Sequence, residues 1–189
     1  MSIQALIFDC DGTLTDSMYA HYVAWRDVLV AYGMELNEQQ FYRHSGTPSR
    51  RVIPMLAAEQ GIKLDFDRAN EAKERAFLES IHLLKPIEPV VRIAESHRGQ
   101  LKMAVASGGV RELVHRQLRH IEIFDWFETI VTAEDTELHK PDPDVFLEAA
   151  RRLGVPPSAC RVYEDGEAGI EAARRAGMEF VDIREMAGV

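Results

Sequence analysis

The sequence predicts an α/β protein that has a doubly wound parallel sheet and a small all-helical segment inserted after the first strand. In residues 83–189, short apolar runs alternate with helical patterns, which is typical of parallel strands connected by helices. Residues 17–82 contain at least three helical patterns and no convincing strand. We therefore expect an α/β core made of residues 1–16 and 83–189, and a helical cap domain at residues 17–82.

The expected strands are brief, mostly apolar runs that end at polar residues or glycine, as buried parallel strands do. They cover residues 5–8, 102–107, 129–133, 160–163 and 179–183. The helical patterns of the core cover residues 87–96, 110–119, 144–153 and 168–176.

Local signals also place helices within residues 17–82. Apolar residues recur at helical spacing before Gly33, which is placed to end the first helix. Asn37 and Gln40 form a capping pair that opens a second helix. Pro54 is expected to kink or delimit the helix in which it lies.

The composition of the chain narrows its class. The 189 residues are 46% apolar, which is enough for one sizeable core with a smaller appendage. No apolar run is long enough to cross a bilayer, and Asp9 interrupts the N-terminal run too early for a signal sequence, so we expect a cytoplasmic protein with no membrane partner. Cys10 and Cys160 form no metal or disulfide pattern. The net charge of -9 disfavours a nucleic-acid partner. We expect the protein to be a monomer, and a dimer remains an alternative.

The first strand is followed by two carboxylates, Asp9 and Asp11, and then by a glycine turn. In open α/β sheets, ligands bind in the crevice outside the carboxyl ends of the strands. Carboxylates crowded at such a place are unfavourable unless a metal or a reaction uses them. We therefore expect Asp9 and Asp11 to be functional.

Polar residues also follow the other strands. They are Ser107-Gly108-Gly109 after the second strand, Lys140-Pro141 in the loop after the third, and Glu164-Asp165-Gly166 after the fourth. In a parallel sheet these groups share one crevice with the two aspartates, and the helix that follows Gly108 offers backbone donors to an anion. Because four carboxylates would repel an anion, we expect a divalent cation, and oxygen ligands favour Mg²⁺ over zinc.

Each of these groups also has a plain structural explanation. Acids that follow a strand often cap a helix, Ser107 alone is more often a cap than a phosphate ligand, and Lys140 before a proline is usually an exposed turn residue. The four strand ends together are harder to explain in this way, because each supplies a group that the same chemistry requires. The joint pattern favours a functional site.

These motifs resemble those of a known family. Asp9-Cys10-Asp11-Gly12-Thr13, Ser107, Lys140-Pro141 and Glu164-Asp165 resemble, in this order, the four signatures of the haloacid dehalogenase superfamily of phosphotransferases. The helical insert and the segments 140–146 and 163–170 are similar to those of the β-phosphoglucomutase-like subfamily. Within it, the chain most resembles bacterial fructose-1-phosphate and 6-phosphogluconate phosphatases.

The resemblance implies a role for each core residue. Asp9 would attack phosphorus and form an aspartyl-phosphate, and Asp11 would act as the general acid and base. Mg²⁺ would be held by the Asp9 side chain, the Asp11 backbone carbonyl, Asp165 and Glu164, the last directly or through water. The phosphoryl group would be bound by Ser107, Gly108, Gly109 and Lys140, and Lys140 would also offset the charge on Asp9.

The resemblance also points to substrate residues in the cap. His21 and Trp25 share one face of the first cap helix, where packing is the ordinary explanation, but a histidine at this offset is a substrate contact in the subfamily's mutases. Arg75 falls where those mutases carry a cap lysine. The segment 46–51 resembles their arginine-bearing loop, with Arg50 or Arg51 one or two positions later. Gly166 stands where many relatives have a serine, which leaves the support of Asp165 open.

Three functions fit these residues. The first is a Mg²⁺-dependent phosphatase of small phosphate monoesters, with sugar phosphates as the expected substrates. The shifted arginines and the replaced lysine favour this function. The second is a hexose-phosphate mutase that retains and reorients a bisphosphate. The third is a non-enzymatic phospho-receiver switch, which Asp11 and the large helical insert disfavour. A dehalogenase is disfavoured because it needs neither Asp11 nor a metal cluster.

Overall fold

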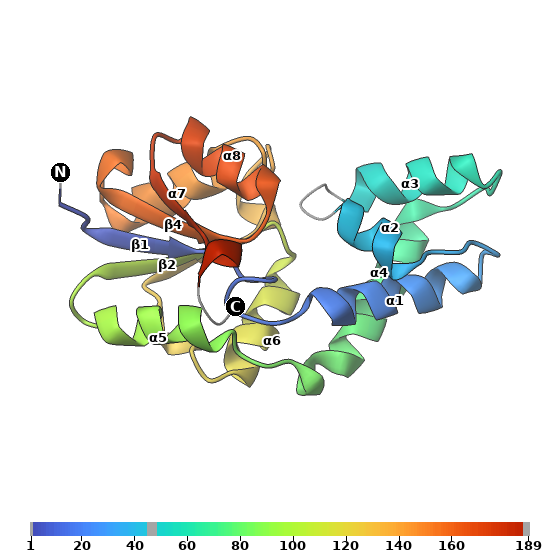
Figure 1. The fold of residues 1–189 in the computed structure, drawn as a ribbon, viewed down its shortest axis with the longest axis horizontal. Helices are drawn as coiled ribbons and strands as arrows, with labels where there is room; N and C mark the ends of the chain where they lie inside the picture. The colour runs from blue at the N-terminus through green and yellow to red at the C-terminus, as the bar shows by residue number, and fades with distance from the viewer. Residues whose placement is uncertain (1, 45–48, 187–189) are drawn as a thin grey trace. The chain divides into compact units, whose positions relative to one another are not determined.

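The computed structural model describes residues 2–44 and 49–186. The chain divides into two compact units, one made of Met1–Asp16 and Leu84–Val189 and the other of Ser17–Leu83. The first is an α/β unit and the second is helical (Figure 1). In the described part of the chain, no helix combines the length and the apolar character needed to span a membrane.

The α/β unit is built on a five-stranded parallel sheet, which confirms the predicted fold class. The strand order is β3-β2-β1-β4-β5. The strands are β1 (Ala5–Phe8), β2 (Lys102–Ala106), β3 (Thr129–Val131), β4 (Cys160–Glu164) and β5 (Glu179–Asp182). Phe8 at the end of β1 pairs with Val105 on one side and Tyr163 on the other. Because these three strands end almost level, the residues that follow them meet at one edge of the sheet.

Helices cover both faces of the sheet. They are α5 (Glu88–His97), α6 (Arg111–His120), α7 (Asp144–Leu153) and α8 (Glu167–Arg175). Figure 1 shows α7 and α8 on one side of the sheet and α5 and α6 on the other. Successive β1 residues serve the two faces: Ile7 packs in the cluster that includes α7 and α8, and Leu6 packs in the cluster that includes α5 and α6. Burying each such side chain contributes about 1.5–3 kcal/mol.

Short 3₁₀ helices complete the unit, and two of them begin at the last residue of an expected strand, 129–133 or 179–183, so these strands are shorter than predicted. The 3₁₀ helices of this unit are η2 (Phe124–Trp126), η3 (Ala133–Asp135), η4 (Pro157–Ala159) and η5 (Ile183–Glu185). The third strand was expected at 129–133 but ends at Val131. It ends there because Thr132 and Asp135 form a reciprocal capping box, in which the Asp135 carboxylate accepts a hydrogen bond from the Thr132 backbone N–H.

The helical unit contains α1 (Met18–Val30), α2 (Glu38–Arg43), α3 (Ser49–Glu59), α4 (Phe66–Ser80) and η1 (Ile81–Leu83). The predicted capping box of Asn37 and Gln40 is present at the start of α2. Gly33 follows α1 with a φ of 72°, in the left-handed region that glycine tolerates. Pro54, which we expected to kink or delimit its helix, lies inside α3 and does not delimit it.

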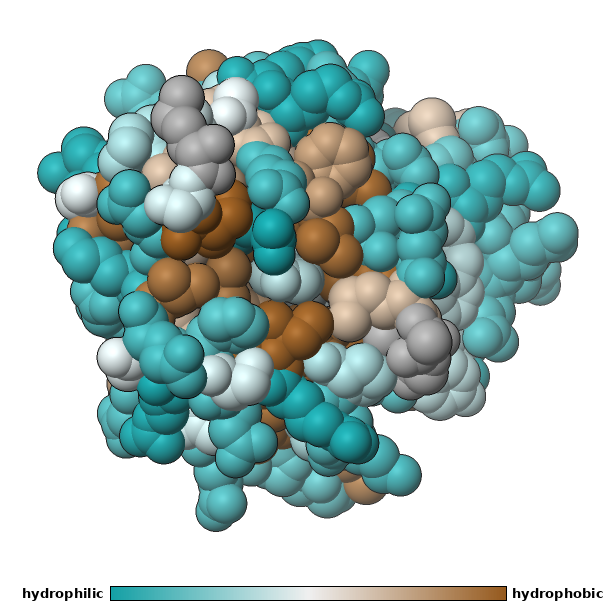
Figure 2. Space-filling view, turned by 60° about the vertical axis from the view of Figure 1, so that its left-hand side comes forward, coloured by the Kyte–Doolittle hydropathy of each residue, from teal (hydrophilic) through white to brown (hydrophobic). Residues whose placement is uncertain are grey.

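The surface carries mainly polar side chains. On the face shown in Figure 2, hydrophilic residues cover most of the area and hydrophobic residues appear in patches between them. Such a mixture is ordinary, because folded proteins always leave apolar atoms exposed.

Candidate active site

The ends of β1, β2 and β4 are joined by one lysine. The Lys140 ammonium donates hydrogen bonds to Asp9 Oδ1 at 2.5 Å, to Glu164 Oε2 at 2.8 Å and to the backbone oxygen of Ala106 at 3.1 Å. Its side chain is only 12% exposed, so these are buried, charge-assisted contacts. The structure thus brings together Asp9, Lys140 and Glu164, three of the residues that were expected to meet at the carboxyl ends of the strands.

Three carboxylates form a cluster that fits a metal ion. Asp9, Glu164 and Asp165 each offer an oxygen, and these oxygens lie within 4.8 Å of one another. Asp9 and Glu164 are buried, and Asp165 is partly buried. A donor set made of oxygens alone suits a hard divalent cation such as Mg²⁺ or Ca²⁺ better than zinc. The acidic cluster is therefore suited to hold a divalent ion.

The electrostatics of the cluster support this fit. Burial and the carboxylate of Glu164 raise the pKa of Asp9 well above its usual value, and Lys140 opposes that rise. Burial and Glu164 also raise the pKa of Asp165 to about 6. Burial alone would lower the pKa of Lys140, but Asp9 and Glu164 raise it above its usual value, so Lys140 is charged. A divalent cation would supply the further positive charge that the ionised carboxylates need.

Asp165 is held by the turn that follows β1. Thr13 Oγ1 donates a hydrogen bond to Asp165 Oδ1 at 2.9 Å. Gly12 has a φ of 82°, and a Cβ added there would lie 2.4 Å from Asp165 Oδ2. Glycine is therefore required at this position both by the backbone and by the close carboxylate. Gly166 has no hydroxyl that could bind Asp165, and the hydroxyl of Thr13 provides this hydrogen bond.

Glu164 is held by the start of α8. Its Oε1 accepts a hydrogen bond from the Gly166 backbone N–H at 3.0 Å, and its Oε2 accepts one from Lys140. A Cβ added to Gly169 would lie 2.0 Å from Oε2, so any larger residue would displace the carboxylate. Gly169 makes room for Glu164 inside a helix, where glycine is otherwise unfavourable.

Asp11 faces the turn that follows β2. Its Oδ1 accepts a hydrogen bond from Gln117 Nε2 at 2.9 Å. A Cβ added to Gly109 would lie 3.4 Å from Asp11 Oδ2, so this second oxygen is next to the turn. Within the turn, the Gly109 backbone N–H donates to Ser107 Oγ at 3.0 Å, and Ser107 is only 1% exposed while Gly108 is exposed.

The beginning of α6 is less open to an anion than the sequence suggests. The Arg111 backbone N–H donates to both carboxylate oxygens of Glu134, each at 3.0 Å. A helix N-terminus binds anions through its unpaired N–H groups, and this one already has a carboxylate partner. The backbone donors that we expected from the start of this helix therefore do not include the Arg111 N–H.

Some site residues were missed by sequence reasoning. The sequence indicates Thr13 only as part of a motif and does not single out Gln117 or Gly169 as site residues. A glycine within a helical pattern signals a close approach, so Gly169 could have been found. Gln117 gives only a weak signal, as a polar residue among the apolar positions of α6.

In the helical unit, the predicted substrate residues differ in burial. Trp25 is 1% exposed and belongs to the hydrophobic core of this unit. The His21 ring stacks on Phe77, with ring centroids 3.9 Å apart. Arg75 is exposed, whereas Lys73, which the sequence reasoning missed, is 8% exposed and lies over the Phe77 ring at 5.4 Å. Lys73 is four residues from Phe77 on the buried face of α4, and this spacing could have revealed it.

The predicted arginines lie at the beginning of α3. Arg50 pairs with Asp67 at 2.6 Å and lies over the Phe66 ring at 4.9 Å, so it connects α3 to α4. Arg51 is exposed. The preceding part of the predicted loop, residues 46–48, lies outside the described residues.

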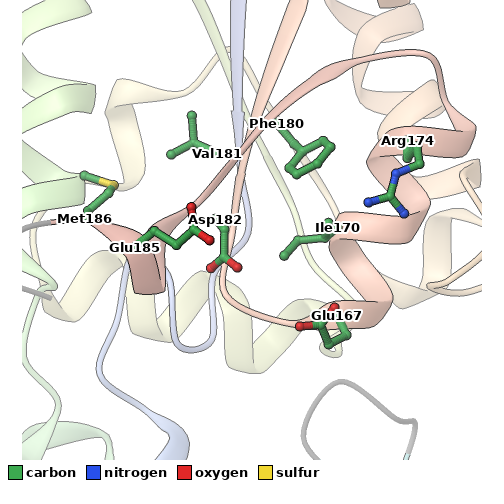
Figure 3. Close-up of a pocket in the computed structure, with 8 residues that line it drawn as sticks. All are labelled: Glu167, Ile170, Arg174, Phe180, Val181, Asp182, Glu185 and Met186. Carbon is green, nitrogen blue, oxygen red and sulfur yellow. The ribbon is translucent and has the colours of Figure 1, made fainter.

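A pocket of about 550 Å³ lies elsewhere in the α/β unit, beside α8 and β5. Figure 3 shows the carboxylates of Glu167, Asp182 and Glu185 around it, together with the guanidinium of Arg174. Arg184 already pairs with Glu167 and Asp182. Because carboxylates dominate its rim, this pocket is a poor place for a phosphate group.

Comparison with known proteins identifies the family. The profile described as haloacid dehalogenase-like hydrolase matches residues 6–183. The fructose-1-phosphate phosphatase YqaB of Escherichia coli is 37% identical over 181 residues, which are 95% of each chain. A phosphorylated carbohydrates phosphatase of Thermotoga maritima is 31% identical, over 95% of this chain and 84% of its own. The crystal structure of a β-phosphoglucomutase from Clostridium difficile matches with a TM-score of 0.80 and 28% identity, over 94% of this chain and 83% of that one. The chain therefore belongs to the haloacid dehalogenase-like hydrolases, which confirms the resemblance found in its motifs.

Proposed function

We propose that this enzyme is a phosphatase that hydrolyses small phosphate monoesters, sugar phosphates above all, through an aspartyl-phosphate on Asp9. The observation that best supports the proposal is the buried contact of Lys140 with Asp9 and Glu164, beside Asp165. Membership of a hydrolase family supports an enzyme over a phosphorylation switch. Relatives named as phosphatases of fructose 1-phosphate and of phosphorylated carbohydrates support this substrate class.

In the proposed reaction, Asp9 and Asp11 divide the chemistry. A carboxylate oxygen of Asp9 attacks phosphorus, and the bond from phosphorus to the ester oxygen breaks while Asp11 gives that oxygen a proton. A water then attacks the phosphorus of the aspartyl-phosphate and gives a proton to Asp11 while the bond from phosphorus to the Asp9 oxygen breaks. This step releases inorganic phosphate and restores the Asp9 carboxylate and the protonated Asp11. Two easier displacements thus replace one difficult displacement.

Fixed donors would hold the phosphoryl oxygens during both steps. Lys140 keeps its charge at neutral pH, Ser107 would offer its hydroxyl and Gly108 its backbone N–H, and the Gly109 N–H donates to Ser107 Oγ and so orients that hydroxyl. The side chains of Asp9, Glu164 and Asp165, with the Asp11 backbone carbonyl, would hold Mg²⁺. Mg²⁺ bound there would neutralise the carboxylates and the transferring phosphoryl group.

We propose that the helical unit is the cap domain and selects the substrate. His21 remains a candidate substrate contact. Arg50 and Arg51 are weaker candidates, because their only support is that both side chains are exposed. The burial of Trp25 favours packing for that residue. Lys73 is a better candidate cation than Arg75, because its charge is held against aromatic rings. The proposed enzyme is a cytoplasmic monomer that acts on a phosphorylated metabolite.

A phosphate-release screen tests the proposal. Sugar phosphates, phosphoglycolate and nucleotides are incubated with the purified protein, with Mg²⁺ and after chelation, and Asp9→Asn serves as the blank. We expect release of inorganic phosphate from sugar phosphates that requires Mg²⁺ and is absent in the blank. Interconversion of glucose 1-phosphate and glucose 6-phosphate without phosphate release would favour a mutase instead.

A further inference from the structure

Gln117 on α6 is a fully buried amide that has a specific partner at each end. Its Nε2 donates to Asp11 Oδ1 at 2.9 Å, and its Oε1 accepts from Thr15 Oγ1 at 2.7 Å. Gln117 has an exposed fraction of 0%, and the α6 residues around it, Leu113, Val114 and Leu118, are apolar and buried. Burying an amide is unfavourable unless it is hydrogen-bonded, and a leucine would suit packing alone. The residue type is therefore explained by its two polar partners.

Thr15 provides a rigid anchor for this amide. It is fully buried, its backbone N–H donates to the Cys10 oxygen at 3.0 Å, and its backbone oxygen accepts from the Gly12 N–H at 2.8 Å. The hydroxyl of Thr15 lies 3.2 Å from the same Cys10 oxygen. Because the oxygen end of Gln117 is attached to this turn, its NH₂ group cannot rotate away from Asp11 without breaking a buried hydrogen bond.

The two oxygens of Asp11 consequently have different surroundings. Oδ1 is held by Gln117, whereas Oδ2 lies beside Gly109, where an added Cβ would be 3.4 Å away. Gly109 belongs to the turn with Ser107 that we assign to the phosphoryl group. A carboxyl held at one oxygen presents the other in a fixed direction, which is what proton transfer to a bound group requires.

We propose that Gln117 is a positioning residue for Asp11, which fixes Oδ1 so that Oδ2 carries out both proton transfers. This inference rests on the proposed phosphatase function. In the first step the proton on Oδ2 moves to the ester oxygen as its bond to phosphorus breaks. In the second step Oδ2 receives a proton from the attacking water. Oδ1 accepts the hydrogen bond from Gln117 throughout, so the amide need not move between the steps.

The test compares two kinds of leaving group in Gln117→Leu. A sugar alkoxide needs a proton as it leaves, whereas nitrophenolate leaves readily without one. With the sugar phosphate that the wild type hydrolyses fastest in the screen, we expect kcat/KM to fall about 30-fold and KM to change less than about twofold. The fall is smaller than the roughly 10²–10⁴-fold of general acid catalysis because Asp11 itself is still present. With p-nitrophenyl phosphate, kcat/KM should fall less than about threefold.

Two further variants make the test specific. Leu118→Ala changes the neighbouring residue of α6, which is fully buried in the hydrophobic cluster, so any loss should be equal for the two substrates. Thr15→Val removes the anchor and keeps Gln117, and we expect a selective loss of about fivefold for the sugar phosphate. Thermal unfolding will show whether Gln117→Leu folds. If it does not fold, Thr15→Val provides the test in its place.

Different failures have different meanings. An equal loss on both substrates, or no loss on either, in a folded Gln117→Leu or Thr15→Val variant would overturn the positioning role. If the wild-type protein released no phosphate from any ester in the screen, the proposed function itself would fail, and the comparison of leaving groups would not be reached.

Discussion

The α/β unit and the helical unit each bury a lysine against aromatic rings, Lys140 over Phe146 and Lys73 over Phe77 and Trp25, but the two sites differ in their carboxylates. In the α/β unit, Lys140 is bound by two carboxylates and a backbone oxygen, all at hydrogen-bond distance. In the helical unit, Lys73 lies 5.4 Å and 5.9 Å from the centroids of the Phe77 and Trp25 rings. Hydrogen bonds between ions are short and directional, so the positions of Lys140 and its two carboxylate partners are tied to one another.

This difference suggests where the enzyme is constrained and where it is adaptable. The core site depends on strands that end level, so the position of each carboxylate is fixed by the backbone. The helical unit packs through aromatic and aliphatic side chains, in which changes of similar volume are tolerated. The core would therefore fix the reaction, and the helical unit would adjust the substrate.

The largest effect is expected at Asp9. Asp9→Asn replaces the attacking carboxylate by an amide, which is a poor nucleophile, so turnover should fall about 10⁴-fold or more. The measurement is steady-state phosphate release, with circular dichroism to confirm the fold. Asp16→Asn is the matched control, because Asp16 is an exposed aspartate of the same segment, and it should retain activity. Substantial turnover by Asp9→Asn would mean that another group attacks phosphorus.

Removal of the Lys140 charge should have the next largest effect. Lys140→Met leaves Asp9 and Glu164 buried without their shared partner, so the free energy of unfolding should fall by about 3–5 kcal/mol. kcat should also fall about 10²–10³-fold, as for loss of a preorganised charge at a transition state. Urea unfolding and phosphate release measure the two effects. Exposed Lys85→Met is the control, and a Lys140→Met protein as stable and active as wild type would refute the comparison between the units.

The sequence predicts well the helices and strands of the α/β core, and the edge of the sheet at which the site residues meet. The helix at 144–153 and the strand at 5–8 have the predicted bounds, because unbroken apolar patterns define them. The arrangement in which Asp9, Lys140 and Glu164 meet follows from parallel strands whose carboxyl ends lie at one edge.

The contacts that support the site were harder to predict. Thr13 reaches Asp165 and Gln117 reaches Asp11 across more than 100 residues of sequence, and such distant partners depend on how each helix is rotated on the sheet. Lys73 was missed for a different reason. Helical patterns are usually recognised from apolar residues, and a lysine can bury its stem on the same face.

A third prediction separates stability from activity within the α/β unit. Burial alone would raise the pKa of Asp135, but hydrogen bonds from Arg152 and Thr132 lower it to about 2. A lowered pKa means that Asp135 stabilises the folded state above about pH 4 and that this contribution disappears as the pH falls toward 2. Asp135→Asn should therefore reduce the free energy of unfolding by about 2 kcal/mol at pH 7, and by less below pH 4.

The control for Asp135 is Asp142→Asn. Asp142 pairs with Arg175 at 3.5 Å on the surface, so its removal should change stability by less than about 0.5 kcal/mol. Urea unfolding at several pH values measures both variants, and both should keep normal kcat. If the free energy of unfolding differed between Asp135→Asn and wild type by the same amount at every pH, the charge of Asp135 would not explain its effect on stability.

The smallest effect is expected in the helical unit, where Lys73 and Arg75 can be compared directly. Lys73→Met keeps the length of the stem and removes a charge that we propose attracts the phosphorylated substrate, so KM should rise about threefold to tenfold with little change in kcat. Arg75→Met removes a charge from an exposed position of the same helix, and KM should change less than about twofold. Steady-state kinetics on the preferred sugar phosphate measures both. Equal effects would mean that net charge alone acts on the substrate, and a fall in kcat for Lys73→Met would show that this unit takes part in the reaction as well as in the choice of substrate.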